Sequence, residues 1–186
     1  MKTTAFFVII LSMIFTSSCT RNNSADSKEM AEEENEDKFE KSENADDASF
    51  AVEAADGGMM EVMLGNLALK NATSPALKEF GRQMVNDHGN GNKQLKALAE
   101  QKGISIPTVL SDKNQKKVDD LSTKTGADFD KAYADLMVED HKADIDAFRK
   151  QAEKGNDPEL KAWAGETLPM LEHHLQMAEG NRKQLK

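Results

Sequence analysis

Apolar residues recur every three or four positions over long stretches of the chain, and this spacing constrains the fold more than any other feature. From position 50 to 68, and again from 77 to 98, the spacing alternates between four and three residues. Such a pattern is typical of helices packed in a bundle, because it places one stripe of side chains along each helix. An aromatic content of only 5% also fits helices better than a β-sandwich.

Two prolines mark positions where helices begin. Pro75 follows Ser74 and Pro158 follows Asp157, and proline is favoured at the first helical position after such capping residues. We therefore expect a short polar helix over 112–123 and four long helices, over residues 49–71, 75–101, 127–153 and 158–185. Short turns make two antiparallel hairpins, and the long connection between them can run the length of a bundle. The expected fold is an all-α, four-helix bundle with the ferritin-like connectivity.

The two hairpins also resemble each other in sequence. Residues 75–80 parallel 158–163 at an offset of 83 positions, whereas 48–50 parallel 127–129 at an offset of 79. The two offsets predict that one loop differs in length by four residues. The similarity is that of a duplicated helical hairpin, although six-residue matches between amphipathic helices also arise by chance.

Residues 1–18 have the features of an export signal. Lys2 precedes an apolar run of 11 residues, which is too short to span a bilayer as a helix. Small residues follow, and then Cys19, the only cysteine of the chain. This order resembles the lipobox of bacterial lipoproteins, although Thr16 stands where leucine is expected. The resemblance implies a lipidated Cys19 and an envelope location. We expect the anchor to lie in the outer membrane and the domain to face the periplasm or the cell surface. An ordinary secretory signal is the alternative.

Acidic residues concentrate in the segment that follows. Residues 26–47 hold 11 acidic and 3 basic residues, so that most of the formal net charge of −9 lies there. Such a segment buries too little apolar surface to offset its ordering entropy, which predicts an acidic, disordered tether over 19–47. The domain then spans 48–186, with a nearly balanced 22 acidic and 19 basic residues.

Composition excludes several classes of function. An acidic chain lacks the basic face typical of a nucleic-acid partner, and a single cysteine excludes a disulfide framework and a cysteine-based zinc site. The chain carries no phosphate loop or nucleotide motif, and no Ser/His/Asp order.

One polar residue interrupts each apolar stripe. Glu61 is the only charged member of the first stripe, and His88 is the only titratable member of the second. In the third and fourth stripes, His141 and His174 have apolar neighbours three or four residues away. All four fall near the middle of their helices, whereas His173 falls at the edge of its stripe. We therefore expect four inward groups to meet near the midplane of the bundle.

These residue types suit a metal ion. A buried glutamate is costly unless it is paired, neutral imidazole is a common ligand, and a carboxylate can complete a four-coordinate site. One glutamate and three histidines therefore predict a site for Zn²⁺ or Fe²⁺. Copper or haem is less favoured, because methionines 84, 137 and 170 are more simply core filler. The alternative is a Glu/His network that stabilises the core without metal.

Four stretches of the domain match a known pattern. They are 50–51 with 57–62, 84–88, 129–130 with 139–141, and 168–175. Together they resemble the ferritin-like family catalogued as domain of unknown function 4142, found in bacterial envelope proteins. The resemblance implies an all-helical fold and an envelope location, and it implies no established catalytic activity.

Ferritin-like di-iron proteins use one glutamate on one helix of each pair and Glu-x-x-His on the other. Glu61 matches the first carboxylate, and His88 and His174 match the two histidines. Val85 and Leu171 stand where the paired glutamates are expected, so too few inward carboxylates remain for di-iron chemistry. We therefore expect an envelope-anchored binding or stress-related module with a mononuclear site or none. A structural or protein-interaction module is the alternative.

Overall fold

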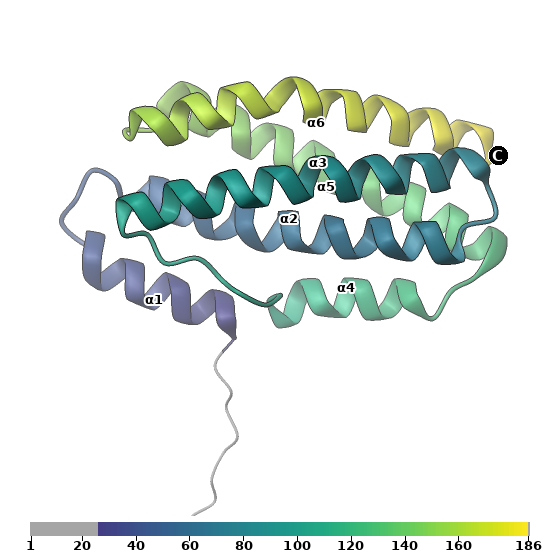
Figure 1. Cartoon of the computed structure of the whole chain (residues 1–186), viewed down its shortest axis with the longest axis horizontal. Coiled ribbons are helices and arrows are strands. Elements are labelled where there is room, and N and C mark those ends of the chain that lie inside the picture. Colours follow the sequence, from purple (N-terminus) through teal and green to yellow (C-terminus); the bar gives the residue numbers. More distant parts are fainter. Residues whose placement is uncertain (1–25, 186) are drawn as a thin grey trace, which may run out of the picture.

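The structure is a computed structural model that describes residues 26–185, so the expected signal over 1–18 and the expected lipidation site at Cys19 lie outside the described residues. The helices, in chain order, are α1 (Ser27–Phe39), α2 (Ala45–Asn71), α3 (Pro75–Lys102), α4 (Asp112–Ser122), α5 (Gly126–Lys154) and α6 (Pro158–Gln184) (Figure 1). Residues 26–185 contain no strand. The expected all-α fold is confirmed, and α2 to α6 lie close to their expected bounds.

The four long helices α2, α3, α5 and α6 form a bundle (Figure 1). α2 and α3 make one antiparallel hairpin, α5 and α6 make the other, and α2 packs beside α5 while α3 packs beside α6. The connection that carries α4 runs back along α2 and returns the chain to the end of the bundle where α3 began. None of the described helices has the length and apolar character needed to span a membrane.

Helix α1 differs from the disordered tether expected over 19–47. Its side chains contribute little apolar burial, but polar contacts hold it against the rest of the chain. The buried amide of Asn35 donates to the carbonyl oxygen of Ser105 at 2.7 Å and accepts from its N–H at 2.8 Å. Lys28 pairs with Glu53 of α2 at 2.5 Å. Composition predicted disorder because it counts apolar surface and misses such paired hydrogen bonds.

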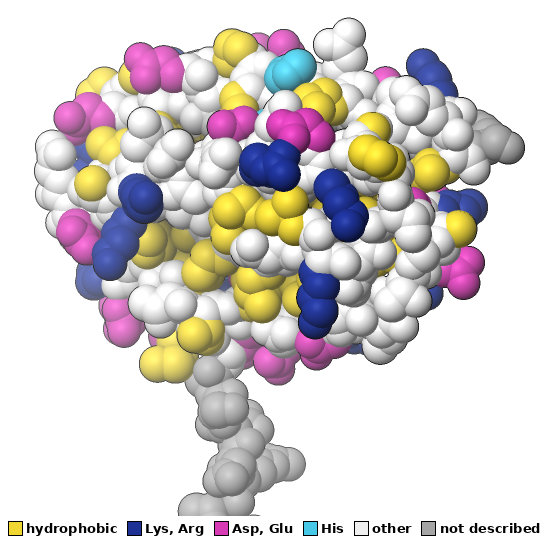
Figure 2. Space-filling model, turned by 45° about the vertical axis from the view of Figure 1, so that its right-hand side comes forward, with side chains coloured by type: hydrophobic (Ala, Val, Ile, Leu, Met, Phe, Trp, Pro, Cys, Tyr) yellow, Lys and Arg dark blue, Asp and Glu magenta, His cyan; other side chains and the backbone are white. Residues whose placement is uncertain are grey.

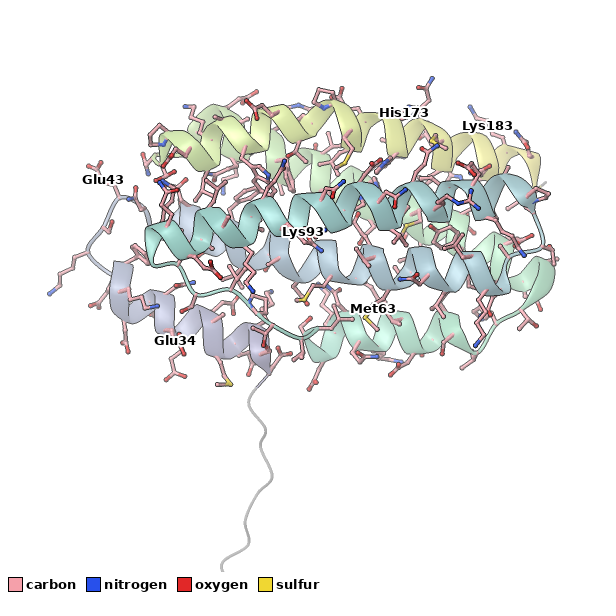
Figure 3. The ribbon with its side chains drawn as sticks, in the orientation of Figure 1. Glu34, Glu43, Met63, Lys93, His173 and Lys183 are labelled. Atoms are coloured by element: carbon pink, nitrogen blue, oxygen red, sulfur yellow. The ribbon has the colours of Figure 1, made fainter. Side chains whose placement is uncertain are left out.

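The surface of the domain carries charges of both signs. On the face shown in Figure 2, hydrophobic side chains gather near the centre, basic side chains lie beside them, and acidic side chains lie mostly nearer the edge. The labelled side chains Lys93, Met63 and His173 extend outward from the helices in Figure 3. This mixture agrees with the nearly balanced charge of residues 48–186.

The apolar core has two parts, one at each end of the bundle. One part surrounds Phe80, Phe129 and Tyr133, near the α2–α3 turn. The other surrounds Leu160 and Trp163, near the α5–α6 turn. Between the two parts, each bundle helix contributes buried titratable side chains. The bundle is therefore apolar at both ends and polar in the middle.

Two buried aspartates tie the hairpins together reciprocally. Asp130 of α5 accepts hydrogen bonds from the backbone N–H groups of residues 73 and 74, in the α2–α3 turn, at 2.9 Å each. Asp47 of α2 accepts from the N–H groups of residues 156 and 157, in the α5–α6 turn, at 3.1 and 2.9 Å. Each turn therefore has its orphan donors satisfied by the opposite hairpin.

These bonds reveal one internal symmetry. Asp47 and Asp130 are 83 positions apart, as are Pro75 and Pro158. Both hairpins turn through three residues, 72–74 and 155–157. The expected four-residue difference in loop length is therefore wrong, because a single offset relates both helices of each hairpin.

Helices α2 and α3 approach closely where two glycines face each other. A Cβ atom on Gly65 would lie 2.7 Å from the carbonyl oxygen of Gly81, and one on Gly81 would lie 2.8 Å from the carbonyl oxygen of Gly65. Contacts that short do not occur in folded proteins, so both positions need glycine for this helix spacing.

Replacing either glycine should therefore separate the two helices. We expect Gly65→Ala or Gly81→Ala to lower the free energy of unfolding by about 1–3 kcal/mol, measured by chemical denaturation. Gly89 of α3 is the control, because nothing lies within 4 Å of a Cβ added there. Gly89→Ala should raise stability by up to about 1 kcal/mol, and equal effects at all three positions would contradict the close approach.

Candidate metal centre

Four buried side chains, one from each bundle helix, meet in the polar layer. Glu61 comes from α2, His88 from α3, His141 from α5 and His174 from α6, and none of them is more than 5% exposed. A Glu61 carboxylate oxygen lies 2.7 Å from His88 Nδ1, and the other lies 3.5 Å from His141 Nε2. His88 Nε2 lies 3.2 Å from His174 Nδ1. The structure thus brings together the four residues that the stripes predicted to face inward.

Each imidazole has one ring nitrogen turned outward to a hydrogen-bond acceptor. The three contacts are His88 Nδ1 to the Glu61 carboxylate at 2.7 Å, His141 Nδ1 to the Met137 carbonyl oxygen at 3.0 Å, and His174 Nε2 to the Asp87 carboxylate at 2.9 Å. An acceptor at the outer nitrogen favours a proton there and leaves a lone pair on the inner nitrogen. Histidines that bind metal ions have this arrangement, with a carboxylate or carbonyl behind the ring.

The three rings also face one another. One ligand atom from each histidine lies within 4.8 Å of those of the other two. The distance of 3.2 Å between His88 Nε2 and His174 Nδ1 is close to the spacing of about 3.4 Å between two nitrogens bound to a tetrahedral zinc. Two inward lone pairs at this distance repel each other unless a proton or a cation lies between them.

Burial keeps these imidazoles neutral. Loss of solvation lowers the pKa of His88 to about 4 and, together with the neighbouring His88 ring, lowers the pKa of His174 to about 4. Burial and the two other rings lower the pKa of His141 well below its ordinary value. Neutral imidazole is the form that binds a metal ion.

Glu61 belongs to a second set of possible metal ligands, which differs from the set of three histidines. Its carboxylate lies with His141 and Asp144 in a set whose ligand atoms are within 4.8 Å of one another, and the three histidines form a set without it. Burial, followed by the charge of Asp140, raises the pKa of Glu61 well above its ordinary value. Burial and the charge of Glu61 raise the pKa of Asp144 to about 9. The geometry thus divides the expected four-residue site into two sets that share His141.

Three acidic residues of this region were not predicted as site residues: Asp87, Asp140 and Asp144. Asp144 lies three positions after His141, a spacing that puts both on one face of α5, so the sequence carried a signal for it. Asp87 lies on α3 but faces His174 on α6, which only the packing of the two helices reveals. The region therefore contains two more largely buried carboxyl groups than the stripes predicted, those of Asp140 and Asp144, and a partly exposed one, that of Asp87, behind His174.

The methionines near the histidines pack into the apolar core. Met84 and Met137 are fully buried in the apolar part near the α2–α3 turn, and Met170 packs against the other part. Beside the polar layer, Gly57 and Gly91 line a cavity of about 30 Å³, and a Cβ on either would meet nothing within 4 Å. These two glycines leave space, unlike the pair that brings α2 and α3 together.

Comparison with known proteins agrees with this fold. A solved structure described as "CopM in the Cu(II)-bound form" is similar with a TM-score of 0.64 and 16% identity, covering 75% of this chain and 97% of that chain. At this identity the likeness shows a shared fold alone. A search of curated proteins gave no match. The family model described as "Domain of unknown function (DUF4142)" matches residues 30–180, from within α1 to within α6. The chain therefore belongs to this family, whose resemblance its sequence had already indicated.

Proposed function

We propose that this protein is an envelope metal-binding module that holds one transition-metal ion between His88, His141 and His174. The observation that carries the proposal is the pairing of each outer ring nitrogen with an acceptor while the inner nitrogens face one another. This arrangement orients three neutral donors toward one point, which a core that only needs to satisfy its histidines does not require.

The donor set narrows the choice of ion. Imidazole nitrogen suits Zn²⁺, Cu²⁺, Fe²⁺ and Ni²⁺, and among divalent ions Cu²⁺ binds such donors most tightly. The sequence alone favoured zinc or iron over copper. The shared fold with a structure described as Cu(II)-bound supports raising copper to the same rank as zinc. We therefore propose Cu²⁺ or Zn²⁺ as the bound ion.

A test of the proposal compares two adjacent histidines of α6. His174 faces the centre and is fully buried, whereas His173 is exposed. We expect the purified chain, loaded with Cu²⁺ or Zn²⁺ and desalted, to retain about one ion that His174→Ala loses and His173→Ala keeps. Elemental analysis measures the content, and circular dichroism checks that each variant folds.

The same experiment distinguishes the structural alternative. A Glu/His network without metal predicts that folded wild type and folded His174→Ala hold the same background amount of metal. It also predicts that Glu61→Gln changes only stability. Folded wild type that holds only background metal after loading with Cu²⁺ and with Zn²⁺, or folded His174→Ala that retains as much metal as wild type, would overturn the metal proposal.

Asp87 offers an independent test, because it lies behind a ring and does not face the three inner nitrogens. Its side chain is 42% exposed, so its replacement should leave the fold intact. We expect Asp87→Asn to weaken metal affinity by about 10–100-fold, as for other carboxylates behind ligating histidines. Competition with a chromophoric chelator measures the affinity. Asp146→Asn, an exposed change on α5, should leave it unchanged, and equal affinities in both variants would refute the role of Asp87.

We also propose that the module is tethered to a membrane through Cys19. The proposal rests on the export-signal pattern of residues 1–18 and on the lipobox-like position of the only cysteine. The mature chain is expected to begin at Cys19 and to carry the mass of a lipid on it, with the domain facing the periplasm or the cell surface. Intact-mass measurement of the detergent-extracted protein tests this, and an unmodified Cys19 would refute it.

A further inference from the structure

A second group of ligands lies beside the three histidines. We name it the carboxylate cluster. Its centre is Glu61 on α2 and Asp144 on α5, whose ligand atoms lie with that of His141 within 4.8 Å of one another, and Asp140 of α5 lines the same pocket as Asp144. We infer that this cluster is a separate cation site that takes one hard divalent ion of the Mn²⁺ or Mg²⁺ class. The inference does not require a metal ion at the histidines.

Unpartnered buried atoms carry this inference. Among the described residues, five buried side-chain polar atoms have no hydrogen-bond partner. Three are carboxylate oxygens of this cluster, Glu61 Oε1, Asp140 Oδ2 and Asp144 Oδ2, and a fourth, His141 Nε2, lies 3.5 Å from Glu61 Oε1. The side chains of Glu61 and His141 are only 4% and 0% exposed. Buried polar atoms nearly always have partners. The raised pKa values of Glu61 and Asp144 fit a proton shared between these two carboxyl groups, and a bound cation can take the place of that proton.

The charges at this place are also unbalanced. Within residues 26–185, the one lysine ion pair of these three carboxyl groups is that of Lys117 on α4, whose Nζ lies 3.2 Å from Asp140 Oδ1, and Lys113 lies on the wall of the same pocket. The side chain of Lys117 is 32% exposed, so it reaches the cluster from the solvent side. In the part of the chain that the structure describes, no lysine or arginine pairs with the unpartnered oxygens Asp140 Oδ2, Glu61 Oε1 and Asp144 Oδ2.

The internal symmetry places two of the acids face to face. Glu61 and Asp144 are 83 positions apart, the offset that relates Asp47 to Asp130. They therefore occupy equivalent positions of the two hairpins, on the adjacent helices α2 and α5. A carboxylate oxygen of each lies within 4.8 Å of one from the other, so the two acids can bind one ion from two helices.

Solvent reaches the cluster by its own route. A pocket of about 270 Å³ between α2, α4 and α5 is lined by Asp140 and Asp144, with Lys113 and Lys117 also on its wall. Asp144 also lines the small cavity that touches Glu61 and His88. A cation can thus arrive at the carboxylates without passing the three histidines.

The two donor sets differ in chemical preference. Carboxylate oxygens suit Mg²⁺, Ca²⁺ and Mn²⁺, whereas imidazole nitrogens suit Cu²⁺ and Zn²⁺. Mn²⁺ serves as the probe for the carboxylate cluster because its electron spin reports binding directly. This difference separates the inference from the proposed function.

The experiment titrates the purified, chelator-treated chain with Mn²⁺ and follows free Mn²⁺ by electron paramagnetic resonance. We expect wild type to bind about one Mn²⁺ and the double variant Asp140→Asn/Asp144→Asn to bind it at least about tenfold more weakly. The exposed Asp146→Asn is the matched control and should bind as wild type does. Wild type that binds no Mn²⁺, or a folded double variant that binds it equally, would overturn the inference.

Two further variants keep the outcome clear. Lys117→Ala removes the competing ammonium on α4 without touching a ligand, and it should tighten Mn²⁺ binding at least about threefold; unchanged or weaker binding would contradict the site. His174→Ala lacks a donor of the histidine set but keeps all three acids, so it should retain Mn²⁺. If His174→Ala loses Cu²⁺ or Zn²⁺ but retains Mn²⁺, the histidine site and the carboxylate site bind their ions independently.

Discussion

The contact between Glu61 and His88, at 2.7 Å, anchors a polar layer inside an otherwise apolar bundle. Burial of a carboxyl group and three imidazoles costs free energy unless each group finds a partner. The partners come from different helices, so a slip of one helix by a turn would set a polar group against the apolar core at one end. The layer therefore fixes the register of all four helices, a use of buried polar groups known from coiled coils.

Other contacts hold the helices in the axial alignment and spacing that the polar layer requires. Asp47 and Asp130 hold the turn of the opposite hairpin, so the two hairpins cannot slide past each other without breaking these bonds. Gly65 and Gly81 set the spacing within one hairpin. Turn anchors at the two ends, a close approach and a central polar layer therefore all specify the same packing, which is the consistency expected of a well-defined fold.

The sequence predicted what depends on local periodicity and missed what depends on contacts between helices. A stripe at spacings of three and four is determined by burial along one helix, so the long helices and the inward His141 could be read directly. Helix α1 could not, because its attachment depends on a hydrogen-bonded Asn35 and not on apolar area. Asp87 and Asp140 acquire their roles only when α3 meets α6 and when α4 covers α5.

The polar layer combines a symmetric frame with asymmetric ligands. Equivalent positions carry acids in both hairpins at Glu61 and Asp144, but the positions equivalent to His141 and His174 are Gly58 and Gly91, 83 residues earlier. Both glycines line the cavity of about 30 Å³ beside the layer, a volume comparable to that of one water molecule. Four large rings would overfill the midplane of a bundle packed at ordinary density. Gly58 instead makes room for the side chain of Asn92, which a Cβ there would overlap, and Gly91 leaves open space, because nothing lies within 4 Å of a Cβ added there.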